Sequence, residues 1–352
     1  MPNHARTAAG CERVPGHTLY VARFLISRLS SLGDVVCCLP AASALKAGFP
    51  GCHITWLADP RFAAVVECCT AVDRVVEAGP GLNLYGEEFD AAFDLQGLLK
   101  SALPIGKARS KNKLGYHWQR EGSWLFSRRV LPDPTSFHIV DQYVDVARAA
   151  GGVADRADFA LKPDPAAEQR VQEMLSASPS SKIPNPIPGQ HGRAEIQIPK
   201  SDRGVDKPIV VLNAGAGWAS KRWPTAYFAR LIDDLAPFAH SVLIGSKGHD
   251  DRLAAGEVIA ACRERPIDLV GRTSIKELIA LISQAGAHVG GDTGSTHIAA
   301  ALGRPAIGLY SITRPRRSCP YGQIERCHYE AAGLDRITPE VVLQTVLESV
   351  RR

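Results

Sequence analysis

Residues 287–310 restrict the fold of this chain more than any other stretch. They read A-H-V-G-G-D-T-G-S-T-H-I-A-A-A-L-G-R-P-A-I-G-L-Y. The pattern predicts a short apolar strand, a polar turn containing glycine, a helix of small residues over about 295–302, and a second strand over 306–310. Because a strand, a helix and a second strand in this order form a parallel crossover, the stretch indicates an α/β protein.

The turn in this stretch carries groups that suit an anion. Asp292 follows the strand, and Gly294, Ser295 and Thr296 are expected to present backbone N–H groups and two hydroxyls at the helix N-terminus. The helix dipole and the free N–H groups favour a phosphate there. His297 is expected one turn inside the helix. Taken alone, the stretch is equally compatible with an ordinary capped helix in which His297 is satisfied internally.

Strands and helices alternate along the rest of the chain in two runs, one over about 20–150 and one over about 209–310. Between them lies S-P-S-S-K-I-P-N-P-I-P-G-Q, which has neither a helical nor a strand period and predicts a linker or a surface insertion. We therefore predict two Rossmann-like domains with parallel sheets. The predicted parts are a disordered leader (1–18), an N-terminal domain (19–175), a linker (176–207), a C-terminal domain (208–335) and a final helix (336–352) that packs back on the first domain.

Composition favours a cytoplasmic globular protein. The chain has 352 residues, of which 45% are hydrophobic and 22% charged, and no apolar run reaches the roughly 18 residues that span a bilayer. Its first residues lack the apolar core of a secretory signal. The chain has nine cysteines, and the adjacent pairs lie in apolar segments with a helical pattern. This indicates free buried thiols rather than disulfides or a zinc site. The net charge of +5 permits an anionic partner.

Three more polar loops follow predicted strands. They are S-S-L-G-D (30–34), D-L-Q-G-L-L-K (94–100) and N-A-G-A-G-W-A-S-K-R-W-P (213–224). The glycines of the last loop allow a ligand to approach the backbone, and Lys221 suits a diphosphate, although such a lysine can also be a solvated surface residue. We expect the loops of both domains to line one central cleft, because open α/β sheets bind ligands at the carboxyl ends of their strands.

Several functions are disfavoured. No Walker P-loop is present, and no G-x-G-x-x-G follows the first strand, which argues against a P-loop kinase and a dinucleotide oxidoreductase. The segment 107–120 is basic and includes Lys107, Arg109, Lys111 and Lys113. Taken alone, such a segment is typical of a solvated loop. No motif supports nucleic-acid binding.

The motifs S-S-L-G-D, D-L-Q-G-L-L-K, K-R-W-P, D-T-G-S-T-H and P-Y-G, in this order, resemble those of the bacterial lipopolysaccharide heptosyltransferases, glycosyltransferase family 9. The similarity runs from about residue 23 to residue 347. The first two motifs resemble heptosyltransferase I, which adds the first heptose to Kdo on lipid A, whereas the loop at 213–224 is closer to the type II enzyme. The resemblance implies a GT-B fold, with the acceptor bound by the N-terminal domain and ADP-heptose by the C-terminal domain.

The resemblance also implies roles for single residues. Asp34 falls on the family's proposed general base. The acceptor-side residues are Ser30, Ser31, Gly33 and Lys100. The donor-side residues are Gly217, Lys221, Asp250, Thr273, Asp292, Thr293, Gly294 and His297. Asp251 is an alternative to Asp250 at the ribose. Gly217 stands where type I members have a threonine, so the resemblance implies that one hydroxyl contact to phosphate is absent here.

The expected reaction is an inverting single displacement without a metal or other cofactor, in which Asp34 deprotonates the acceptor hydroxyl. Asp34 can instead be the N-cap of a helix over 35–46, or serve both purposes. An acceptor with Kdo carboxylates and lipid phosphates explains the basic text at 107–120, and predicts a monomer attached peripherally to the cytoplasmic face of the inner membrane. Two alternatives remain: a family member with another nucleotide sugar or acceptor, and a non-catalytic nucleotide-sugar-binding protein.

Overall fold

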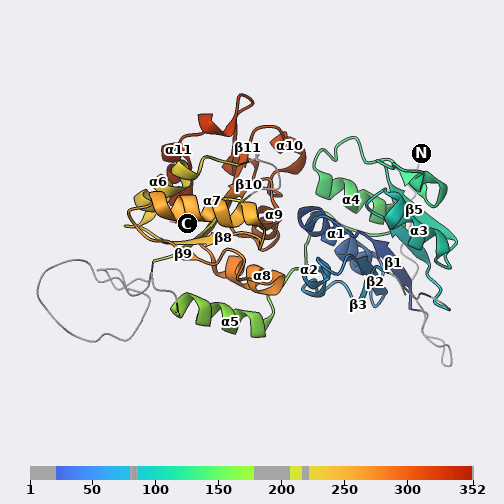
Figure 1. Ribbon diagram of the computed structural model, residues 1–352. Helices are drawn as coiled ribbons and strands as arrows, with labels where there is room; N and C mark the ends of the chain where they lie inside the picture. Colours follow the sequence, from blue (N-terminus) through green and yellow to red (C-terminus); the bar gives the residue numbers. More distant parts are fainter. Residues whose placement is uncertain are drawn as a thin grey trace, which may run out of the picture.

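The computed structural model describes residues 21–79, 82, 84, 86–177, 207–215 and 222–350. These residues form two lobes that lie side by side (Figure 1). The predicted leader, most of the predicted linker, and two predicted donor residues, Gly217 and Lys221, lie outside the described residues.

The first lobe is built on a parallel six-stranded sheet in the order β3-β2-β1-β4-β5-β6. Its central strands are continuous apolar runs, as expected for a sheet covered on both faces. The strands are β1 (Arg23–Ser27), β2 (His53–Ala58), β3 (Arg74–Glu77), β4 (Ala91–Asp94), β5 (Asn112–Tyr116) and β6 (Arg128–Val130). The helices are α1 (Leu32–Gly48), α2 (Ala63–Glu67), α3 (Leu99–Lys107) and α4 (Ile139–Arg148), with a 3-10 turn η1 (Ser123–Leu125).

The second lobe repeats this topology, because its strands follow the order β12-β11-β10-β7-β8-β9. The strands are β7 (Ile209–Asn213), β8 (His240–Ile244), β9 (Ile267–Asp268), β10 (Ala287–Gly291), β11 (Ala306–Tyr310) and β12 (Cys327–Tyr329). The helices are α6 (Thr225–Leu235), α7 (His249–Ala261), α8 (Ile275–Gln284), α9 (Gly294–Ala301), α10 (Pro315–Ser318) and α11 (Pro339–Val350), with 3-10 turns η4 (Ile324–Arg326) and η5 (Leu334–Arg336). In chain order, each sheet has the arrangement 3-2-1-4-5-6 of a Rossmann fold, which confirms the predicted pair of α/β domains.

The start of α1 differs from the prediction. The helix begins at Leu32, three residues before the predicted start at residue 35, and its N-cap is Ser31. Asp34 is therefore the third residue of the helix and completes a capping box with Ser31, so the alternative that Asp34 is the N-cap is wrong. The Ser-x-x-Asp spacing explains the difference, because Ser31 and Asp34 satisfy the first N–H groups together.

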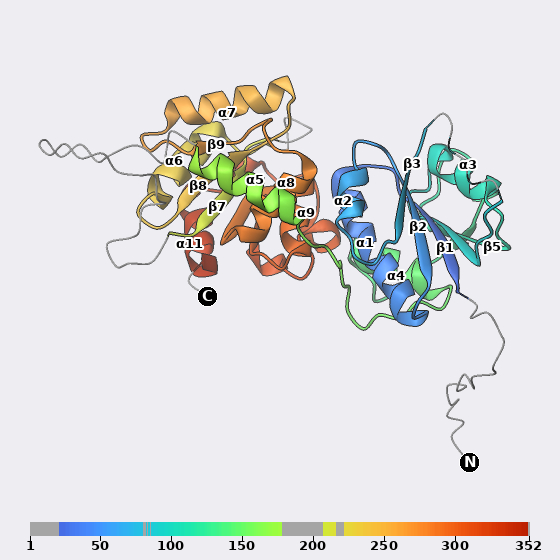
Figure 2. The ribbon, with the colours of Figure 1, turned by 90° about the horizontal axis from the view of Figure 1, so that it is seen from below.

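The last helix also differs from the prediction. Instead of packing back on the first lobe, α11 packs on α6 and beside β10, and buries Val342 and Val346 in the core of the second lobe. The next helix in the chain after the first lobe is α5 (Pro165–Ser176). It lies along α8 of the second lobe (Figure 2). Arg170 Nε lies 2.7 Å from Glu277 Oε1 across that contact. The chain therefore crosses between the lobes before α5, ahead of the predicted linker.

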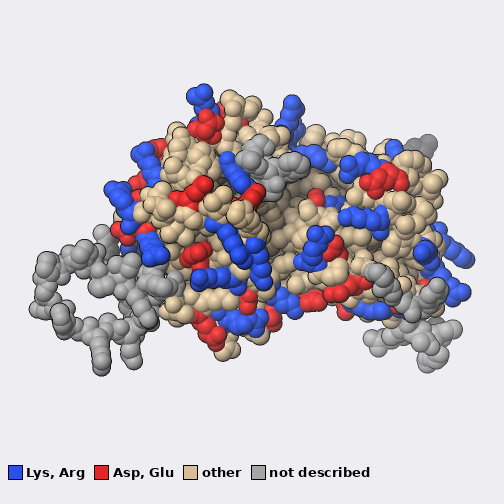
Figure 3. Space-filling model, viewed as in Figure 1, with Lys and Arg blue, Asp and Glu red and all other residues tan. Residues whose placement is uncertain are grey.

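The two lobes meet through helices that begin at the carboxyl edges of both sheets. Helix α1 packs against α9, and α2 packs against α8, where Lys276 Nζ lies 2.7 Å from Glu67 Oε2. Figure 3 shows the surface hollowed between the lobes, with Lys and Arg side chains around the hollow. This arrangement brings the polar loops of both domains to one cleft.

Candidate active site

Asp34 is held at the start of α1 by contacts to one of its two carboxylate oxygens, Oδ2. The backbone N–H and the hydroxyl of Ser31 donate to Asp34 Oδ2 at 3.2 and 2.8 Å. Arg28 Nη2 lies 3.0 Å from the same oxygen. Arg28 is buried, and its Nη1 donates to the Leu95 carbonyl at 2.7 Å and to Tyr143 Oη at 3.1 Å. The Asp34 side chain is still 40% exposed, so a fixed carboxylate faces open space.

The loop before α1 is tied to the end of β4. Gln96 Oε1 accepts from the N–H groups of Leu29 and Ser30 at 2.9 and 3.3 Å. Lys100 Nζ donates to Ser30 Oγ at 3.1 Å. The structure thus brings the predicted acceptor-side residues Ser30 and Lys100 together within hydrogen-bond distance.

The hydroxyls at the start of α9 are bonded within the protein, although Ser295 also lines the cleft as expected. Thr296 Oγ1 donates to the Gly291 carbonyl at 2.7 Å, and Asn213 Nδ2 donates to Ser295 Oγ at 2.9 Å. Thr293 Oγ1 lies 3.0 Å from Ser295 Oγ. Local sequence could not show this, because the partner Asn213 comes from β7. The backbone at the start of α9 remains at the edge of the cleft, where Gly294 lines it.

Two histidines beside this turn have opposite pKa shifts. His288 is fully buried, and burial, with a contribution from His297, lowers its pKa to about 3, so this ring is neutral. His288 Nε2 lies 3.0 Å from Ser295 Oγ. Burial alone would lower the pKa of His297, but Cys37 and Asp292 raise it well above its usual value. Because the Asp292 carboxylate lies 3.4 Å from His297 Nε2, we assign the positive charge to His297.

The lobes approach each other closely where α1 and α9 begin. A Cβ atom on Gly294 would lie 2.6 Å from Leu32 Cγ, and one on Gly33 would lie 2.9 Å from His297 Cδ2. His297 Nδ1 lies 3.6 Å from Cys37 Sγ in the opposite lobe. The two glycines are therefore needed for the packing of the lobes rather than for a turn.

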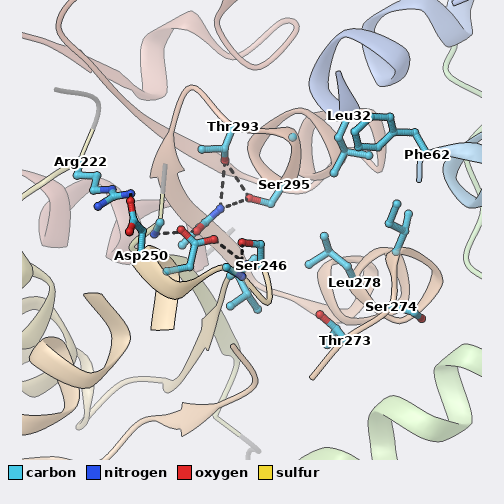
Figure 4. Close-up of a pocket in the computed structure, with 18 of the residues that line it drawn as sticks. Leu32, Phe62, Arg222, Ser246, Asp250, Thr273, Ser274, Leu278, Thr293 and Ser295 are labelled. Atoms are coloured by element: carbon cyan, nitrogen blue, oxygen red, sulfur yellow. Dashed lines mark hydrogen bonds and ion pairs between the residues drawn. The ribbon is translucent and has the colours of Figure 1, made fainter. Parts of the chain in front are cut away.

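A cavity of about 620 Å³ lies between the lobes. Leu32 and Phe62 from the first lobe lie opposite Thr273 and Leu278 from the second (Figure 4). At its other end Arg222 Nη2 lies 3.0 Å from Asp250 Oδ2. Apolar walls with a few polar groups suit a nucleoside.

Asp250 and Asp251 both line this cavity. Asp251 Oδ2 accepts from the N–H of Ser246 at 2.7 Å, and the Asp251 carboxylate lies against Gly215, where a Cβ atom would meet Oδ2 at 2.9 Å. Asp251 therefore holds one backbone loop against another, whereas the exposed Asp250 pairs with the side chain of Arg222. This difference favours Asp250 as the carboxylate that meets a ligand.

A second cavity of about 350 Å³ adjoins the first, and both are lined by Thr293 and Gly294. Its wall brings together acceptor-side and donor-side residues predicted from the sequence, namely Ser31, Gly33, Asp34, Asp292 and His297. Thr313 and Arg317 also line it and were missed, as was Phe62 in the larger cavity. No local pattern marks these three residues, because they reach the cleft only through the packing of one lobe on the other.

The family assignment rests on a match over most of the chain. Residues 81–335 match the model of glycosyltransferase family 9 (heptosyltransferase). The chain belongs to this family. It is therefore a glycosyltransferase, as the sequence motifs predicted.

Similar proteins agree with this assignment. The chain is 26% identical to the lipopolysaccharide core heptosyltransferase OpsX of Haemophilus influenzae, over 85% of this chain and 82% of that protein. It is 27% identical to lipopolysaccharide heptosyltransferase 1 of Pseudomonas aeruginosa, over 86% of this chain and 82% of that protein. Both relatives are aligned over more than four fifths of their length.

Solved structures show the same fold. A family 9 glycosyltransferase from Veillonella parvula has a TM-score of 0.76 at 17% identity, with 94% of this chain and 97% of that chain covered. The E. coli ADP-heptose heptosyltransferase II has a TM-score of 0.72 at 21% identity, with 94% and 99% covered. The two-lobed architecture is therefore the GT-B fold.

Within the described ranges, no helix combines the length and the apolar character needed to cross a bilayer. In the same ranges, no three His, Cys, Asp or Glu side chains gather in a way that could hold a metal ion.

Proposed function

We propose that this glycosyltransferase moves heptose from ADP-heptose to an anionic acceptor of the lipopolysaccharide inner core, either Kdo-lipid A or heptosyl-Kdo-lipid A. One observation carries the proposal. The nucleoside-sized cavity and the Asp34 cavity share Thr293 and Gly294, so a sugar joined to a nucleotide in the first would reach the carboxylate in the second. The relatives are named heptosyltransferases, and one solved neighbour is the E. coli enzyme WaaC with ADP.

The donor is assigned to the larger cavity. Its apolar walls, which include Leu32 and Leu278, would hold the adenine ring, and Asp250 would accept hydrogen bonds from the ribose hydroxyls. The diphosphate would lie at the N-terminus of α9, where backbone N–H groups and the helix dipole favour negative charge. Lys221, which lies outside the described residues, is the further cation that the family resemblance predicts for this charge.

Asp34 is assigned the role of general base. It would take the proton of the acceptor hydroxyl as the oxygen attacks the anomeric carbon, and ADP would leave from the opposite face with inversion. The Ser31 and Arg28 bonds to one oxygen, Oδ2, fix the orientation of the carboxylate and leave Oδ1 for the proton. The negative charge that develops on the diphosphate would be met by α9 without a metal.

The acceptor is assigned to the first lobe. Lys107, Arg109, Lys111 and Arg120 are exposed there, whereas Lys113 is half-buried and donates to the Gly106 carbonyl at 2.6 Å. The four exposed cations would attract an acceptor that carries carboxylates and phosphates, and would attach a monomeric enzyme to the cytoplasmic face of the inner membrane.

A transfer assay tests the proposal directly. Purified protein is incubated with ADP-heptose and Kdo-lipid A, with and without the first heptose, and product is detected by mass spectrometry. Transfer to one acceptor supports the proposal and decides between the first and the second addition. If neither acceptor is modified and the protein instead transfers a sugar from a different nucleotide sugar, it would be a family member with another donor. Binding of ADP-heptose without transfer or hydrolysis would indicate a binding protein.

A further inference from the structure

Arg317 crosses from the second lobe to the first beside the Asp34 cavity. It lies on the short helix α10, and its side chain is exposed. Arg317 Nη2 donates to Tyr116 Oη at 3.2 Å, and the guanidinium carbon lies 5.1 Å from the centre of the Trp118 ring. Tyr116 ends β5 and Trp118 follows it, so both contacts are with the lobe to which we assign the acceptor.

The positive charge of Arg317 is not neutralised by the protein. In the part of the chain that the structure describes, no ion pair joins Arg317 to a carboxylate, whereas Arg28 pairs with Asp34 and Arg222 pairs with Asp250. A guanidinium has five N–H donors in a planar fork that matches a carboxylate or a phosphate. Tyr116 accepts from only one of these nitrogens, and Trp118 supports the face of the group.

The position of Arg317 also separates it from the nucleotide. Arg317 lines the smaller cavity together with Ser31 and Asp34 but does not line the larger one. An anion held by Arg317 would therefore lie on the side of Asp34 from which the attacking hydroxyl comes.

We propose that Arg317, with Tyr116 and Trp118, forms a subsite for an anionic group of the acceptor, so that the donor lobe also selects the acceptor. The inference rests on the proposed role of Asp34. The shared chemistry is an oxyanion, either a sugar carboxylate or a phosphate ester. Because the subsite needs residues of both lobes, the acceptor's anion would also favour the closed arrangement of the lobes in which Arg317 reaches Tyr116.

The neighbouring Arg316 offers a matched control. It lies on the same short helix, is exposed, and stacks on an aromatic ring of the first lobe, with its guanidinium carbon 4.1 Å from the centre of the Phe137 ring. It lines a different cavity, beside His138 and Tyr321, and not the Asp34 cavity. Arg316→Gln therefore removes the same charge and a similar contact between the lobes without touching the proposed subsite.

The first experiment measures binding without turnover. The intrinsic tryptophan fluorescence, to which Trp118 contributes, is recorded while wild-type protein is titrated with free Kdo, a carboxylate, or with glucose 1-phosphate, a phosphate ester. We expect one probe to change the emission, and this identifies the anion. Arg317→Gln and Trp118→Phe should abolish the response, and Arg316→Gln should keep it. A wild-type protein that responds to neither probe, or an Arg317→Gln protein that still responds, overturns the proposal.

The second experiment uses steady-state kinetics with the acceptor that the transfer assay identifies. Arg317→Gln should raise the acceptor KM roughly tenfold or more, because a charge-assisted pair is lost, and Arg317→Lys should be intermediate. The donor KM should stay within about twofold of the wild-type value. A rise in the donor KM with an unchanged acceptor KM overturns the proposal in favour of a diphosphate contact. Failure of wild-type transfer contradicts the proposed function alone, since the fluorescence titration needs no turnover.

Discussion

Arg28 Nη2 lies 3.0 Å from Asp34 Oδ2, and this ion pair joins the end of β1 to the first turn of α1. The guanidinium is buried and anchored by the Leu95 carbonyl, so it cannot follow a moving partner. The carboxylate is instead drawn to a fixed place at the edge of the cleft. A general base needs such a fixed position, because proton transfer requires the acceptor hydroxyl within hydrogen-bond distance.

Asp34→Asn should abolish most turnover and keep the fold. The amide oxygen of asparagine can still accept from the Ser31 N–H, but it cannot take a proton from the acceptor, so kcat should fall about 10²–10⁴-fold. The rate is measured with ADP-heptose, and folding is checked by thermal melting. Asp164→Asn, at the N-cap of α5 and away from both cavities, serves as the control. A near-normal rate in Asp34→Asn would rule out the general base.

Arg28→Lys should reduce both stability and rate. Lysine keeps the charge but cannot bind the Leu95 carbonyl, Tyr143 and Asp34 together, so we expect a loss of about 1–3 kcal/mol in the free energy of unfolding. We expect kcat to fall roughly tenfold, because Asp34 loses its position. Arg61→Lys is the control, since Arg61 also pairs with a nearby aspartate but is 71% exposed. If Arg28→Lys lowers stability and leaves kcat unchanged, the pair is structural only.

The sequence predicted local structure well where one short pattern decides it. The strand β11 has the predicted bounds, and the helix α9 lies within one residue of its predicted bounds, because apolar period and turn residues determine such elements. The loops at 30–34 and 292–297 also meet at one cleft, as expected. Phe62 and Arg317 were missed because their contacts lie in the opposite lobe, and no nearby residue signals them. For the same reason the packing of α11 was predicted wrongly, since an apolar stripe does not say which lobe covers it.

Gly294→Ala should weaken donor binding without unfolding either lobe. The new methyl group would lie 2.6 Å from Leu32 Cγ, so the lobes must separate or Leu32 must move within the nucleotide cavity. Overpacking of this kind costs about 1–3 kcal/mol, which predicts a rise of roughly tenfold or more in the donor KM. A cost of this size should lower the melting temperature only slightly in a chain of 352 residues.

Gly256→Ala provides the matched control for this substitution. Gly256 lies inside α7, and a Cβ atom there would meet nothing within 4 Å. Alanine should therefore stabilise the helix by about 0.5–1 kcal/mol and leave the donor KM unchanged. Equal donor affinity in both variants would contradict the view that contact between α1 and α9 shapes the nucleotide cavity.

The buried His288 should make stability fall in acid. Its pKa is lowered to about 3 in the folded protein, whereas an unfolded histidine has a pKa of about 6.5. Between these values the unfolded chain binds a proton that the folded protein does not, so the free energy of unfolding falls as pH falls, by up to about 1.4 kcal/mol per pH unit. The pKa of His297 is raised in the folded protein, so protonation of His297 stabilises the fold. This contribution to the free energy of unfolding is lost as pH rises through the folded pKa of His297.

His288→Gln removes this titration and can keep a hydrogen bond with Ser295. Urea unfolding at pH 7 and pH 5 should show that the wild-type protein loses about 2 kcal/mol more than the variant. The same loss in wild-type and His288→Gln proteins would show that His288 does not control the acid transition.

The basic surface of the first lobe should bind anionic membranes. Replacing Lys107, Arg109, Lys111 and Arg120 with serine should weaken binding to vesicles that contain anionic lipid, by about 1 kcal/mol for each cation near the surface. Lys113 is kept, because it supports the Gly106 carbonyl. Binding is measured by vesicle sedimentation at low and high salt, and the difference between the proteins should shrink at high salt. The control replaces four exposed arginines of the second lobe, Arg263, Arg265, Arg304 and Arg336, and should bind nearly as the wild type does. Equal loss in both variants would mean that net charge, and not this surface, attaches the enzyme to the membrane.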